Sequence, residues 1–119
     1  MNNTVSLEYN TLLNNIQAPV FVVDASKHII DINNHTKRLF YSLDIIGKSC
    51  KDIFPECEKS CACPVDAADY RIPTDSQRCK QIMVLNTVKE QVELCIIPVQ
   101  TAHDIVFFHI LTDNDIQNR

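Results

Sequence analysis

The sequence contains a single glycine, Gly47, among its 119 residues. Neither a Gly-rich phosphate-binding loop nor a Gly-x-Ser-x-Gly nucleophile motif is present, and no nucleophile stands with a plausible base. We therefore expect no catalytic activity. Because only one glycine is available, the other tight turns have to rely on Asn, Asp or Ser, and Gly47 itself predicts a backbone position with φ above zero.

Long apolar runs and basic clusters are also missing. The longest apolar stretches, such as "PVFVV" and "IVFF", are far shorter than the roughly 20 residues of a membrane-spanning helix. The opening "MNNTVSLEYN" lacks the basic start and apolar centre of a secretory signal. We expect a cytoplasmic protein, in which thiols stay reduced unless they serve a metal or redox purpose. Eleven basic and fifteen acidic residues give a net charge of −4, and since the basic residues are scattered, no direct nucleic-acid binding is expected.

The first half of the chain predicts short helices and one hairpin. Residues 4–16 carry apolar side chains at helical spacing, and Pro19 disfavours helix in the residue before it. "VFVVD" and "HIIDIN" are β-branched runs separated by the turn formers of "DASK", which predicts a hairpin. Asn34 is expected to cap a helix in "NHTKRLFYSL". "CKDIF" predicts one further helical turn, and the proline-rich stretch after it predicts a loop.

The last third of the chain predicts three successive strands. "CKQIMVLNTV" alternates, with Gln81 on the same face as its apolar partners, and "QVELCIIPV" and "DIVFFHILTD" follow. The links "NTVKEQ" and "QTAHD" are short and polar, as in antiparallel hairpins. The predicted fold class is α+β: a five-stranded antiparallel sheet with helices packed on one face and an N-terminal flanking helix. The other face of such a sheet is free for a partner.

Four of the six cysteines lie within "CKDIFPECEKSCACP", at Cys50, Cys57, Cys61 and Cys63. Four thiolates in one loop can hold a tetrahedral zinc ion or an iron–sulfur cluster. The same thiols can act as a redox switch, for instance by pairing Cys57 or Cys61 with Cys50. The third interpretation is that they are small apolar residues that only pack. The remaining two, Cys79 and Cys95, belong to strands and are expected to pack.

Other candidate site residues lie on the apolar faces. His109 stands among apolar residues of the last strand, where a single histidine is more often a packed residue than a ligand. A ligand pocket between sheet and helices would be lined by Phe21, Val23, Ile32, Phe40, Met83 and Leu85. The alternative is that these six residues form the core, as most such positions do.

These segments resemble the PAS sensory domain over nearly the whole chain. "LLNNIQAPVFVVDASKHIIDINNHTKRLF" is similar to the opening of that family, with Asp24, Asn33, Leu39 and Phe40 in the matching places. "IIGKS", "IFP" and "IIPV" follow in the family's order, and "ILTDNDIQNR" resembles the last strand and the Asp-Ile connector to an output module. A bacterial subgroup with a cysteine cluster ending in Cys-Pro is matched by Gly47, Lys48, Cys50, Phe54, Cys57, Cys61, Cys63 and Pro64.

The resemblance implies a non-catalytic sensory domain of a bacterial signalling or transcription-regulatory protein. It divides the chain into an N-terminal helix at residues 1–17, which supports homodimerisation, a sensory domain at 18–113, and a connector at 114–119 to an output module. Flavin and haem are not expected, because the Asn-Cys-Arg motif is absent and residues 47–78 contain no histidine. The cysteine-rich loop is expected to sense a small ligand, a metal or the redox state. The alternative is a plain dimerisation domain whose cysteines are inert or bind structural zinc.

Overall fold

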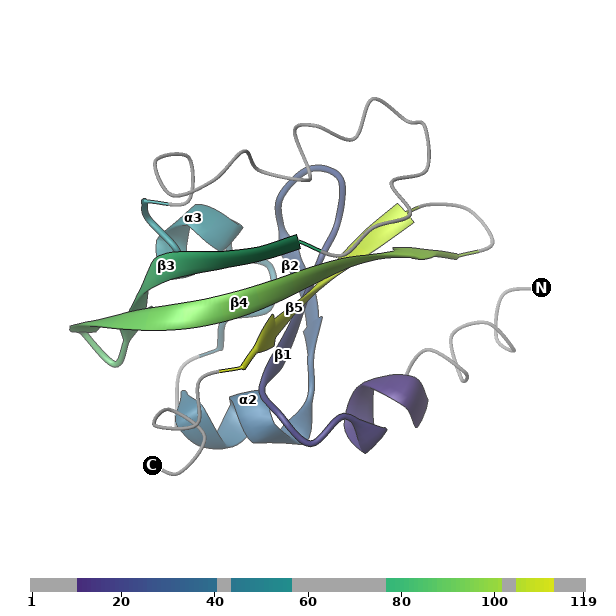
Figure 1. Ribbon diagram of the computed structural model, residues 1–119, viewed down its shortest axis with the longest axis horizontal. Coiled ribbons are helices and arrows are strands. Elements are labelled where there is room, and N and C mark those ends of the chain that lie inside the picture. Colours follow the sequence, from purple (N-terminus) through teal and green to yellow (C-terminus); the bar gives the residue numbers. More distant parts are fainter. Residues whose placement is uncertain (1–10, 41–43, 57–76, 102–104, 113–119) are drawn as a thin grey trace.

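The computed structural model describes residues 11–40, 44–56, 77–101 and 105–112 (Figure 1). Residues 11–15 are helical, and after them come β1 (Val20–Val23), β2 (Ile29–Ile32), α2 (Asn34–Leu39), α3 (Cys50–Ile53), β3 (Gln77–Leu85), β4 (Val88–Gln100) and β5 (Ile105–Leu111). The strands form one sheet in the order β2-β1-β5-β4-β3, and every neighbouring pair is antiparallel. This architecture confirms the predicted fold class.

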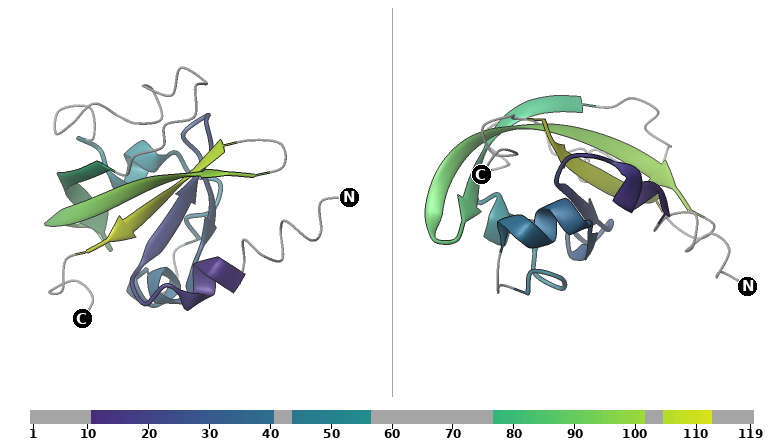
Figure 2. Two further views of the ribbon diagram at one scale, coloured as in Figure 1. Left: turned by 45° about the vertical axis from the view of Figure 1, so that its right-hand side comes forward. Right: turned by 90° about the horizontal axis from the view of Figure 1, so that it is seen from below.

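The two faces of the sheet are covered differently. The sheet curves around α2 and α3, which lie on its concave side (Figure 2). Alternate residues of β3 and β4 point to that side and are buried, among them Met83, Val92 and Leu94, as the sequence predicted. On the opposite side Leu13 of the N-terminal helix packs against Phe108 of β5 in a second apolar cluster. Strands β1, β4 and β5 thus contribute alternate side chains to both layers.

A single buried amide joins the N-terminal helix to the sheet. Asn33, which is 1% exposed, is the N-cap of α2, so the prediction that Asn34 caps this helix is wrong by one residue. Its Oδ1 accepts hydrogen bonds from the backbone N–H groups of Val20 and Thr36, both at 3.1 Å. Its Nδ2 donates to three carbonyls at the end of the N-terminal segment, those of Leu13, Ile16 and Ala18 (3.3, 3.3 and 2.7 Å). The cap site is fixed by these tertiary bonds as well as by the helix itself.

Positive φ angles mark the turns of the sheet. Between β3 and β4 only Asn86 and Thr87 intervene, with φ of 49° and 74°. Two central residues at positive φ are typical of a type I′ turn, whose twist matches the strands on either side. The six-residue link predicted here is therefore wrong, since β4 already begins at Val88. Lys27, in the β1–β2 turn, has φ 67°, and Gly47 has the predicted positive φ, at 94°.

Candidate functional site

The first cysteine of the cluster lies in the core, at the first position of α3. Ser49 caps this helix through its Oγ, which accepts from the Lys51 N–H at 3.3 Å. Cys50 is 3% exposed and belongs to the apolar cluster on the concave side of the sheet. The predicted helical turn in "CKDIF" is thereby confirmed, and it places one sulfur inside the domain.

Backbone hydrogen bonds hold the segment before α3 against the β1–β2 hairpin. Ile29 donates to the Lys48 carbonyl at 2.8 Å, and Gly47 donates back to the Ile29 carbonyl at 2.7 Å. The Cys50 N–H donates to the carbonyl of Lys27 at 2.7 Å. With a φ of 94°, Gly47 turns the chain into this alignment, in a conformation that residues with a Cβ rarely adopt. The start of α3 is therefore fixed to the hairpin by main-chain bonds.

The other predicted metal ligands, Cys57, Cys61 and Cys63, lie outside the described residues. Within the described part of the chain, no group of three His, Cys, Asp or Glu side chains is placed to hold a metal ion. The four-cysteine site thus stays a prediction, of which only Cys50 has a described position. Cys95 is half-buried on β4, on the side away from Leu94 and Ile96, in line with its expected packing role.

An aromatic cluster connects α3 with the centre of the sheet. The Phe54 ring follows α3 and meets the ring of Phe21 on β1 edge to face, with centroids 5.5 Å apart. Phe21 makes a second edge-to-face contact with Phe40, after α2, at 5.7 Å. Phe54 also stacks on His109 of β5, with centroids 6.2 Å apart and an angle of 26° between the planes. These four rings, the aromatic cluster, link both helices to the neighbouring strands β1 and β5.

His109 is a buried polar group within that cluster. It is 5% exposed, and in the tautomer protonated at Nδ1 its ring donates to the carbonyl oxygen of Phe107 at 3.3 Å. Burial lowers the pKa of His109 to about 4, and the hydrogen bond to Phe107 opposes this only in part. The imidazole is therefore neutral near pH 7. Of the two interpretations of this histidine, the structure supports the packed one.

The six residues predicted to line a pocket do come together. All of them belong to the apolar cluster between the sheet and the helices, and none is more than 7% exposed: Phe21, Val23, Ile32, Phe40, Met83 and Leu85. Their burial fits the core interpretation, and their role toward a cofactor stays a prediction. The sequence placed Phe54 in the cysteine-cluster motif but did not predict its packing role. The apolar residues of "CKDIF" were the signal that could have indicated it.

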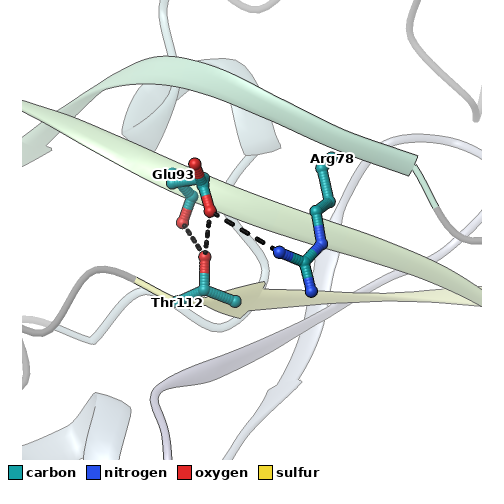
Figure 3. Close-up of polar contacts among 3 residues, drawn as sticks. All are labelled: Arg78, Glu93 and Thr112. Atoms are coloured by element: carbon teal, nitrogen blue, oxygen red, sulfur yellow. Dashed lines mark hydrogen bonds and ion pairs between the residues drawn. The ribbon is translucent and has the colours of Figure 1, made fainter.

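The convex face carries a polar cluster where β5 ends. Glu93 of β4 lies between Arg78 of β3 and Thr112 (Figure 3). Thr112 donates to Glu93 three times, from its N–H and its Oγ1 to the carbonyl oxygen (3.0 and 3.2 Å) and from its Oγ1 to the carboxylate (3.1 Å). The Arg78 guanidinium is 4.0 Å from that carboxylate. An open hollow of about 340 Å³ adjoins the cluster, lined by Lys80, Gln91, Val92, Glu93 and Thr112.

The N-terminal helix presents its apolar side chains in two directions. Leu13 is buried against the convex face and Ile16 packs beside it, whereas Leu12 is 51% exposed. Only part of the predicted apolar stripe is thus covered by the domain's own sheet. In the described part of the chain, no helix has the length and apolar character needed to cross a membrane.

Comparison with known proteins assigns this arrangement to a family. The family model described as PAS domain matches residues 17–117. Among solved structures, the PAS domain of an HTR-like protein from Haloarcula marismortui is similar, with a TM-score of 0.67 and 16% identity over 93% of this chain and 98% of the other. The PAS domain of nitrogen regulation protein NR(II) from Vibrio parahaemolyticus gives 0.65 and 13%, over 88% and 96%.

A PAS domain from a two-component sensor histidine kinase is also similar, with a TM-score of 0.63 and 12% identity over 92% of this chain and 96% of that one. No curated protein sequence is close enough to count as a match. At these identities the solved structures bear on the fold alone, whereas the family model covers most of the chain. The chain therefore belongs to the PAS family of sensory domains that serve in signal transduction.

Proposed function

We propose that this PAS domain is a non-catalytic sensor in a cytoplasmic bacterial signalling or transcription-regulatory protein, and that its cysteine-rich segment, residues 50–64, detects a metal, a small ligand or the redox state. The observation that carries the proposal is the position of Cys50. Its side chain is 3% exposed and packs in the apolar cluster between the sheet and the helices. Any bond that this sulfur forms has to be accommodated by the surrounding core, so a chemical event at the segment changes the packing of the domain.

Two kinds of chemistry suit four cysteines in one segment. Thiolates of Cys50, Cys57, Cys61 and Cys63 would supply the sulfur donors preferred by zinc and by iron–sulfur clusters. In the redox alternative, two thiols react with hydrogen peroxide: a disulfide forms, the O–O bond breaks, and two water molecules leave with the two thiol protons. Either event replaces separate side chains by a closed loop, which restricts the chain between them.

The test compares protein purified without oxygen and in air. Zinc, iron and acid-labile sulfide are measured in both samples, absorbance near 400 nm is recorded, and free thiols are counted with and without reductant. Bound metal, or a disulfide that forms reversibly in air, supports the proposal. In the same assays Cys61→Ser is expected to lower metal content or disulfide yield, whereas the strand variant Cys95→Ser leaves both unchanged. Metal-free protein whose thiols never pair would refute it.

A second candidate function, homodimerisation through the N-terminal helix, is favoured by the apolar side chains that this part of the molecule leaves exposed. Leu12 is 51% exposed beside the buried Leu13, and Ile97, Val99 and Ile110 on the convex face are only partly buried. A second copy of the chain would cover them. Light scattering should give twice the monomer mass, falling toward the monomer in Leu12→Gln. The exposed polar change Asn15→Gln is the control, and a monomer in the unmodified protein would rule the dimer out.

A further inference from the structure

We infer that His109 is the coupling residue of this sensor, the side chain through which a change at the cysteine-rich segment reaches the C-terminal end of the domain. The inference rests on the proposed sensory role of that segment. Its structural basis is the stack of His109 on Phe54, because these two rings join the end of α3 to the central strand β5.

On the α3 side, the contact begins directly at the first cysteine. The Phe54 N–H donates to the Cys50 carbonyl at 2.8 Å, so the two residues close one helical turn. Both side chains are buried in the same cluster. A shift of Cys50 therefore moves Phe54, and since a close-packed interior has low compressibility and transmits strain, the rings that contact Phe54 have to move with it.

On the strand side, His109 belongs to β5, the last strand before the C-terminal end of the domain. His109 pairs with Phe21 of β1 and with Ile96 of β4, so it lies in the middle of the sheet. Thr112 follows three residues later and makes its three hydrogen bonds to Glu93 at the point where β5 stops. A displacement of β5 at His109 is thus transmitted to these bonds and to residues 113–119, the expected connector.

The imidazole gives this position two distinguishable states. Stacked on Phe54, the imidazole is neutral and almost fully buried. With Phe54 withdrawn, water reaches the ring, and its pKa moves back toward 6.5. Cys50 belongs to the apolar cluster that contains Phe54, the ring on which His109 stacks. A stimulus shifts such an equilibrium only if it favours one state over the other, and a bond to Cys50 provides that difference.

The experiment follows the His109 ring and the C-terminal amides in one sample. The 119-residue protein is treated with diamide, which takes up two hydrogens as two thiols become a disulfide, or with dithiothreitol, and zinc serves as a second probe. NMR records the histidine ring signals, with His109 assigned from His109→Phe, and hydrogen exchange is measured for residues 110–119. Oxidation or zinc should shift the His109 signals and change the exchange rates about fivefold or more, the lower range of allosteric coupling.

The variants separate coupling from stability. His109→Phe keeps a ring against Phe54 but removes the polar state, and Phe54→Leu removes the stack; both should reduce the exchange response to less than about twofold. His28→Gln, an exposed change in the β1–β2 turn, should keep it in full. A full response in both core variants overturns the inference, as does disulfide formation that leaves His109 and the C-terminal amides unchanged. If the thiols neither pair nor bind any metal, the proposed function itself fails, and the inference with it.

Discussion

The burial of His109 predicts a specific loss of stability in mild acid. The folded state holds the pKa of this histidine near 4, whereas the unfolded chain has the ordinary value of 6.5. Because the folded pKa is the lower one, the unfolded state binds the proton first, and protonation favours unfolding. The contribution of this group is complete above pH 6.5 and is lost as the pH falls from 6.5 toward 4.

The size of the effect follows from the two pKa values. Between pH 8 and pH 5 the free energy of unfolding should fall by about 2 kcal/mol through His109 alone, and the full loss below pH 4 is about 3 kcal/mol. Since the imidazole is buried, solvent screening reduces this only slightly. A typical domain is stable by about 5–15 kcal/mol, so the effect is large enough to measure.

Urea unfolding followed by circular dichroism suits this protein, because it contains no tryptophan for fluorescence. Stability is measured at pH 8 and pH 5 for the unmodified protein and for His109→Phe, which preserves a ring against Phe54. The variant should lose about 2 kcal/mol less on acidification than the unmodified protein, and the difference isolates His109 from the carboxylates, which titrate in both. His28→Gln should behave like the unmodified protein. Equal pH dependence in all three proteins would refute the argument that His109 is neutral and buried in the folded state.

Three further substitutions have predicted effects on urea unfolding. Asn33→Asp keeps the acceptor for the N–H groups of Val20 and Thr36 but sets a carboxylate oxygen against three carbonyl oxygens. It should lower the free energy of unfolding by about 2–4 kcal/mol and speed amide exchange in residues 11–16. The control Asn34→Asp should lower it by less than about 0.5 kcal/mol. Thr87→Gly should stabilise by about 1 kcal/mol, because its φ of 74° strains a β-branched residue; a loss would contradict the type I′ turn. Cys50→Ser should cost about 1–3 kcal/mol by placing a hydroxyl in the core, and a neutral result would show that the position is not buried.

The strands were predictable because their signals are local. Alternation places Gln81, Met83 and Leu85 on one face of β3, and the structure buries all three. The β1–β2 turn was likewise carried by a short-range signal: the Asp24 carboxylate accepts from the N–H groups of Ser26 and His28, both at 2.9 Å.

Tertiary contacts decided what the sequence left open. Either Asn33 or Asn34 satisfies the local rule for a cap, and bonds to residues 13 to 20 positions earlier in the chain select Asn33. The turn between β3 and β4 contains Thr87, which local preference disfavours at positive φ, because the pairing of the two long strands outweighs it. The sequence pattern predicted the strand that contains His109. Its partner Phe54, however, lies 55 residues earlier in the sequence, and only the fold brings the two rings together.

The sheet order places the first strand of the chain beside the last. The backbone N–H of Leu111 donates to the carbonyl of Pro19 at 3.0 Å, so the start of β1 and the end of β5 lie within one hydrogen bond of each other. The N-terminal helix, which leads into β1, and Thr112, which follows β5, therefore connect to the same end of this strand pair. A small slide of β1 against β5 would therefore change the position of the N-terminal helix relative to Thr112 and its bonds to Glu93.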